Sequence, residues 1–161
     1  MSEKPAIDVQ RFKDVMARWP SGVSVVTTVI NGKPVGITVS AFMSLGINPP
    51  SIIISIDKRS YMVNAIKSAG RFAVTFLNEN EEGLSRLFAS GDENKFRAEW
   101  TEYRNGLPYI RGDTAVFAEL YSSLDAPDHV LFIGRVIEAL ISDKSPLIYY
   151  NRKYFGIREI T

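Results

Sequence analysis

Apolar residues recur along this chain mostly at every second position, as in strands, and three stretches have the helical period instead. The first helical stretch covers residues 7–19, where Asp8 is placed to cap the helix and Pro20 to end it. The other two cover residues 61–69 and 79–89. We expect the helix of residues 7–19 to pack on the body of the domain through its apolar face.

Turn-forming residues divide the strand-like stretches into hairpins. Asn31 and Gly32 separate residues 22–30 from a second Val- and Thr-rich run, and Asn-Gly is a strong hairpin sequence. Residues 48–50, Asn-Pro-Pro, mark the next corner, and the strand of residues 51–56 is apolar enough to be buried on both faces. Further strands are expected over residues 72–77, 115–123, 129–141, 147–150 and 154–157, and a polar surface excursion over residues 90–106.

The order of these elements predicts the fold class. Seven or eight strands joined mostly by hairpins, with helices that do not alternate regularly with them, favour a mainly β protein. We expect an antiparallel β-barrel whose openings are covered by the helices. The whole chain, residues 1–161, is expected to form one domain, with a flexible tail over residues 1–6.

Composition limits the kinds of functional site that the chain can form. The chain has 161 residues, a net charge of +1, no cysteine and one histidine. These values exclude disulfides and thiolate nucleophiles, and they argue against a zinc or haem site and against nucleic-acid binding. The sequence shows no signal-peptide core and no membrane-length apolar run, so we expect a cytoplasmic protein. Any redox activity would need a bound cofactor.

Residues 36–60 combine the features of a ligand site. Hydroxyl side chains come first, followed by the proline corner, an apolar strand, and cations directly before a helix. Lys58 and Ser60 stand where a helix start offers unpaired N–H groups to an anion, although Ser60 could serve equally as a simple cap. The order suits a flat polar ring with a phosphate tail.

Three separated segments carry a recognisable pattern. The first is RWPSGVSVVTT followed by GITVSAFMSLGINPPSIIISID, the second is KSAGRFAVTFLNENEEGLSRLFA, and the third begins at Asp128-His129, continues through Gly134 and Val136, and closes with PLIYYNRKYFGI. Together they resemble the flavin reductase-like family, the short-chain NAD(P)H:flavin oxidoreductases with an FMN-binding split barrel. The resemblance covers roughly residues 10–157.

The resemblance implies a set of site residues. The flavin ring would lie along Thr38, Ser40, Ala41, Phe42 and Ser44, and its ribityl and phosphate groups along Ser55, Asp57, Lys58 and Ser60. Phe88, Ala89 and Tyr154 would lie close to the cofactor, and His129 on the nicotinamide side as the candidate catalytic residue. By pattern alone, Phe88 and Ala89 fit the core and His129 fits a turn, so only the resemblance gives them these roles.

The resemblance also implies an activity. The protein would bind FMN or FAD, transfer hydride to it from NADH or NADPH, act as a homodimer, and supply reduced flavin to a partner monooxygenase. Two alternatives remain open from the residues: an FMN-binding electron carrier without pyridine-nucleotide activity, and a non-redox barrel that binds a phosphate ligand. No nucleic-acid or membrane partner and no metal is expected.

Overall fold

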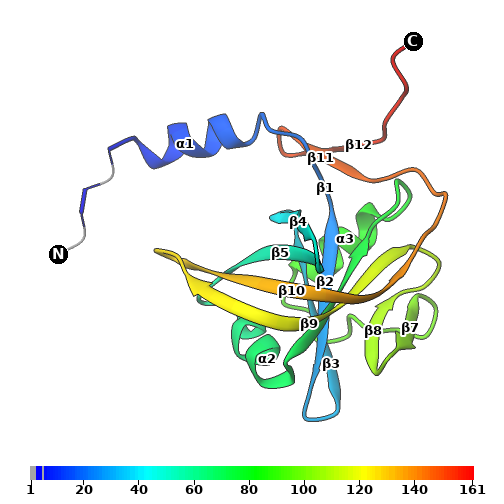
Figure 1. Cartoon of the computed structure of the whole chain (residues 1–161). Helices are drawn as coiled ribbons and strands as arrows, with labels where there is room; N and C mark the ends of the chain where they lie inside the picture. Colours follow the sequence, from blue (N-terminus) through cyan, green and yellow to red (C-terminus); the bar gives the residue numbers. More distant parts are fainter. Residues whose placement is uncertain (1–2, 5) are drawn as a thin grey trace.

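The computed structural model describes residues 3–4 and 6–161, which form three helices and twelve strands (Figure 1). The tail expected over residues 1–6 falls in part on residues outside this described portion. The helices are α1 (Val9–Met16), α2 (Tyr61–Ala69) and α3 (Glu82–Ala89). The strands are β1 (Ser21–Gly22), β2 (Ser24–Ile30), β3 (Lys33–Val39), β4 (Phe42–Ile47), β5 (Pro50–Asp57), β6 (Arg71–Phe76), β7 (Thr101–Arg104), β8 (Leu107–Ile110), β9 (Thr114–Asp125), β10 (His129–Leu140), β11 (Ile148–Tyr150) and β12 (Lys153–Phe155).

Seven strands form one antiparallel sheet in the order β3-β2-β6-β9-β10-β5-β4. Its two edge strands, β3 and β4, follow each other in the chain through Ser40 and Ala41, so the sheet curls around a core. That core combines side chains of six strands with the apolar face of α2, and Phe72, Met62 and Phe132 are wholly buried in it. The expected mainly β, antiparallel architecture is confirmed.

Asn-Gly pairs form two of the hairpins. Asn31 and Gly32 have φ values of 52° and 74°, as the turn between β2 and β3 requires. Asn105 and Gly106 repeat these values and join β7 to β8, within the stretch expected to be an irregular excursion. The second hairpin was therefore recognisable from the same dipeptide.

Strand β5 is buried on one face, so the expectation of burial on both faces is wrong. Ile52, Ile54 and Ile56 point into the core, whereas Ile53 and Ser55 on the other face are partly exposed. The physical reason is that this second face borders a cavity and not a second packed layer. Its neighbour β4 is an additional strand, which the sequence pattern did not predict.

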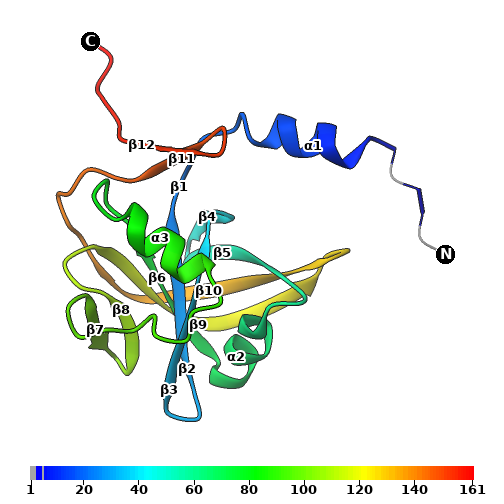
Figure 2. The same ribbon diagram turned by 180° about the vertical axis from the view of Figure 1, so that it is seen from behind.

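Helix α1 begins after Asp8, whose side chain accepts a hydrogen bond from the Arg11 N–H, as expected. It does not pack on the body, however: it projects from it, and none of its residues is buried (Figures 1 and 2). Polar contacts hold its C-terminal end, where the Asn151 N–H donates to the Ala17 carbonyl at 2.8 Å. No helix in the described part of the chain is long and apolar enough to cross a membrane.

Candidate functional site

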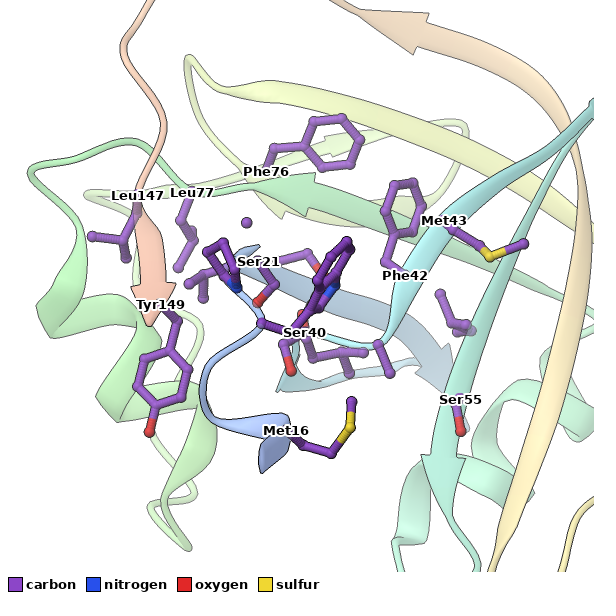
Figure 3. A pocket seen from close by; sticks show the side chains of 18 of the residues that line it. Met16, Ser21, Ser40, Phe42, Met43, Ser55, Phe76, Leu77, Leu147 and Tyr149 are labelled. Atoms are coloured by element: carbon purple, nitrogen blue, oxygen red, sulfur yellow. The ribbon is translucent and has the colours of Figure 1, made fainter. Parts of the chain in front are cut away.

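A cavity of about 1200 Å³ lies where the end of α1, the β3–β4 junction, β5 and β11 come together. Figure 3 shows Phe42, Met43 and Ser55 on one side, Leu77, Leu147 and Tyr149 on the other, and Met16 at the end of α1. The lining is mainly apolar, with hydroxyl groups from a few serines. This composition is typical of a site for a large, flat organic molecule.

Four of the residues predicted from sequence line this cavity: Ser40, Ala41, Phe42 and Ser55. They meet because the β3–β4 junction pairs with β5, where the Ser55 N–H donates to the Ala41 carbonyl at 3.1 Å. The Phe42 N–H donates to the Ser40 carbonyl at 3.0 Å, so this backbone donor is already used. The Phe42 ring packs edge-on against Phe76, with 5.1 Å between ring centroids. The junction is therefore held rigidly from both sides.

Two cations lie at the rim of the cavity. Lys13 of α1 and Arg152 of the β11–β12 turn both line it. Arg152 is paired with Asp14, at 2.7 Å between Nη2 and Oδ1, and this pair lowers the pKa of Asp14. The cavity lining thus includes Lys13 and the Asp14-paired Arg152, and neither cation was predicted from the sequence.

A second group of predicted residues lies beyond the cavity, at the end of the β5–β10 pair. Asp57 and His129 are directly opposite each other, two residues along from Ser55 and Leu131, so all four side chains share one face of the sheet. His129 Nδ1 is 2.8 Å from Asp128 Oδ1, and its side chain is 40% exposed. The predicted nicotinamide-side histidine thus lies on the same sheet face as the cavity wall.

Asp57, Lys58 and Ser60 form the turn into α2, and two of them already have partners. Arg59 donates to the Asp57 carboxylate through its backbone and its side chain, at 2.8 Å in each case, and these hydrogen bonds hold the pKa of Asp57 well below its usual range. The Ser60 hydroxyl caps α2 by accepting from the Met62 N–H. Lys58 is exposed, which makes it the available cation of this turn.

The remaining predicted residues lie outside the cavity lining. Thr38 donates to the Ser85 carbonyl of α3 at 2.6 Å, and the Ser85 hydroxyl is 2.7 Å from that of Tyr154. Phe88 is wholly buried, in a core cluster that includes Leu77 and Leu147 of the cavity wall. Ala89, at the end of α3, and Ser44, on the edge strand β4, are exposed.

Comparison with known proteins identifies the family. Residues 16–158 match the flavin reductase like domain. The chain belongs to this family. The resemblance found in the sequence is thereby confirmed, and family membership makes the chain an oxidoreductase.

Relatives of this flavin reductase-like chain agree with that assignment. A flavin reductase of Pseudomonas putida is 37% identical over 163 residues, which cover 98% of this chain and 95% of the relative. The reductase subunit HsaB of a flavin-dependent monooxygenase from Rhodococcus jostii is 35% identical, with 94% and 80% covered. The solved structure of the flavin reductase PheA2 in its native state superposes with a TM-score of 0.89 at 31% identity, covering 95% of this chain and 100% of that one. The expected split-barrel fold and flavin reductase function are confirmed at the level of the family.

Several residues that line the cavity of this flavin reductase-like domain were not predicted from the sequence. Met16 and Trp19 were assigned to a helix packed on the body, yet they line the cavity from the end of α1. Leu131 also lines the cavity, but the pattern of its strand gave no indication of a ligand site. Leu147 and Tyr149 lie in the closing segment PLIYYNRKYFGI, whose likeness to the family was the available indication of a role at the site.

Proposed function

We propose that the cavity binds FMN or FAD, with the ring on the wall formed by Ser40, Ala41, Phe42 and Ser55, and that NADH or NADPH reduces it there. The observation that carries this proposal is the convergence of these four residues on one cavity of about 1200 Å³ in a flavin reductase-like chain. The volume is ample for a flavin, since ligand pockets of about 300 to 1,000 Å³ are common.

In this reaction the residues of the chain bind the two reactants and orient them. Apolar side chains such as Met43 and Leu147 can contact the ring faces, while the Ser40 and Ser55 hydroxyls can meet its polar edge. When bound, the flavin supplies the redox chemistry by accepting hydride from the pyridine nucleotide. Placement of the two reactants is then the main contribution of the protein to the rate.

Turnover assays test this function directly. Catalytic amounts of protein with excess FMN or FAD are expected to oxidise NADH or NADPH continuously, measured as loss of absorbance of the reduced nucleotide. Oxidation limited to one equivalent per protein would indicate the electron carrier instead. No oxidation, together with no quenching of flavin fluorescence, would support the non-redox barrel. Running the four pairs of flavin and nucleotide side by side also identifies the preferred substrates.

We place the flavin phosphate near Lys58 at the start of α2, where an exposed ammonium group adjoins a helix N-terminus. Lys58→Ala is expected to weaken FMN binding about 10-fold while leaving riboflavin binding unchanged, because only FMN carries the phosphate. Lys13→Ala, which removes a cation at the cavity rim, is the matched control. Equal losses for both flavins in Lys58→Ala would contradict the assignment, and an FMN-specific loss in Lys13→Ala would move the phosphate to the rim.

We assign His129 to the nicotinamide side of the site, where it would orient the hydride donor. The His129 side chain lies on the same sheet face as that of Ser55, and its Nδ1 is 2.8 Å from Asp128 Oδ1. Both observations support this role. His129→Ala is expected to slow hydride transfer about 10-fold, a loss of about 1.4 kcal/mol of transition-state stabilisation, with flavin affinity unchanged. Stopped-flow reduction of the flavin measures the rate, and wild-type rates in the variant would remove His129 from the site.

We propose a homodimer in which a second copy covers α1 and the edge strand β4. Apolar side chains on α1 are uncovered, with Phe12 52% and Val15 58% exposed, and Met43 on β4 is 55% exposed. An uncovered apolar helix and a free strand edge both favour burial against another chain. Sedimentation velocity is expected to give twice the chain mass of 18.0 kDa, and a monomer at all concentrations would contradict this assembly.

The relatives include a monooxygenase reductase subunit, and we propose that this chain likewise passes reduced flavin to a separate monooxygenase. Met16 and Trp19 line the cavity and are exposed, so a bound flavin would lie next to solvent and could leave. In an assay with a flavin-dependent monooxygenase and its substrate, hydroxylated product should form only when this chain and the nucleotide are both present. Product formation that requires neither would contradict the transfer.

A further inference from the structure

Glu81 and Asp113 both accept a hydrogen bond from Asn78, which follows the cavity-lining Leu77 in the chain, and the proposed reaction uses neither carboxyl group. Asp113, between β8 and β9, is 3% exposed. Its Oδ1 accepts a hydrogen bond from Asn78 Nδ2 at 2.8 Å and lies 3.8 Å from Lys144 Nζ. Its Oδ2 is buried and accepts no hydrogen bond from an N–H or hydroxyl group in the described part of the chain. A buried carboxylate oxygen without a donor is costly and indicates a missing proton.

Glu81 is the neighbouring group that can supply this proton. Burial, followed by a hydrogen bond to Asp113, raises the pKa of Glu81 to about 8, so its carboxyl group is protonated at neutral pH. Its Oε1 also accepts from the Asn78 N–H at 2.9 Å, which fixes the group at the start of α3. The charged groups that act on Glu81 are Asp113 and Lys144.

The carboxyl pair is connected to the cavity through the segment of residues 142–147. Glu79 donates its N–H to the Ser145 carbonyl at 2.8 Å, and Leu147 donates its N–H to the Leu77 carbonyl at 3.0 Å. Pro146 and Leu147 line the large cavity, and Pro146 also lines a smaller one of about 100 Å³ that contains Asp113. Pro146 therefore separates Asp113 from the large cavity and forms part of the wall of both cavities.

We propose that Glu81 is a positioning residue for the cavity: the proton it shares with Asp113 holds Pro146 and Leu147 in place, and losing this proton weakens flavin binding in alkaline solution. The inference rests on the proposed function, that this cavity binds flavin. On deprotonation the proton goes to solvent, and the partly buried Glu81 carboxylate then faces the buried Asp113 carboxylate beside one half-exposed ammonium group, Lys144. Repulsion between the like charges pushes apart the segments that carry Glu81 and Asp113.

The direction of the pH dependence follows from the sign of the pKa shift. The pKa of Glu81 is higher in the folded chain, about 8, than its ordinary value of 4.5. Its stabilising contribution is therefore complete below pH 4.5 and is lost as the pH rises toward about 8. Flavin binding should weaken around the upper end of this range, where the folded protein itself releases the proton.

Flavin titrations across this range test the inference. FMN affinity of the wild type, followed by quenching of flavin fluorescence, is expected to fall about 10-fold as the pH rises through about 8. In Glu81→Gln the profile is expected to be flat, because the amide donates to Asp113 at every pH. The exposed neighbour provides the control, and Glu82→Gln should keep the wild-type profile.

Thermal unfolding without flavin provides a second readout. The melting temperature of the wild type should fall relative to that of Glu81→Gln as the pH rises toward 8. Parallel profiles of the two proteins, in binding and in melting, would overturn the role of Glu81 while leaving flavin binding intact. Absence of flavin binding by all three proteins at every pH would instead overturn the proposed function and this inference with it.

Discussion

Gly134→Ala is expected to lower the free energy of unfolding by about 3 kcal/mol and the melting temperature by about 6 to 12 °C. Gly134 lies in β10 with its Cα facing the barrel core. A methyl group there would be 2.7 Å from the Phe72 ring and 2.8 Å from Ala118 Cβ. Both neighbours are wholly buried, so neither can move away cheaply. Circular dichroism during heating measures the loss.

The control for this prediction is a glycine with open space around it. Gly83 lies in α3, and a Cβ added there meets no atom within 4 Å. Gly83→Ala should raise the stability by about 0.5 to 1 kcal/mol, because alanine favours the helix. If both variants melt at the wild-type temperature, the close packing inferred around Gly134 is wrong.

Ala41→Trp is expected to weaken flavin binding at least about 100-fold, which corresponds to about 3 kcal/mol. Ala41 lines the cavity at the β3–β4 junction and is exposed, so a large ring there can occupy the cavity without disturbing the core. Its carbonyl still accepts from the Ser55 N–H, because the backbone is unchanged. Titration with FMN and FAD, monitored by fluorescence, measures the change.

The matched control places the same ring elsewhere on the sheet. Ala139, on β10, is exposed and does not line the cavity. Ala139→Trp should bind flavin with wild-type affinity, and both variants should melt close to the wild type. Undiminished binding by Ala41→Trp would show that the flavin lies outside this cavity.

Local sequence was sufficient to predict most of the helices, strands and turns of the fold. Helix α2 begins after Ser60 and ends at Gly70, whose φ of 68° only glycine adopts readily, as the helix signals require. The Asn31-Gly32 turn and the long β9–β10 hairpin also agree with their patterns. These elements were predictable because their caps and turns depend on neighbouring residues and not on the rest of the fold.

Patterns of burial were less predictable. The period of α1 correctly predicted an apolar face, yet nothing in its sequence says which surface covers that face. In the same way, the apolar run of β5 did not reveal that Ser55 faces a cavity while Ile56 faces the core. Both questions depend on which elements lie opposite, and the local pattern does not contain this information.

Sequence alone determined that the chain is a mainly β protein without thiol chemistry, and it predicted a ligand site in residues 36–60. The tertiary structure decided which of these residues meet. The β3–β4 junction folds onto β5, which brings Ser40, Ala41, Phe42 and Ser55 to one cavity, whereas Thr38 on β3 donates its hydroxyl to α3. It also paired Glu81 with Asp113 across 32 positions of the chain, a contact that no local period can encode, because it follows from how separate loops pack.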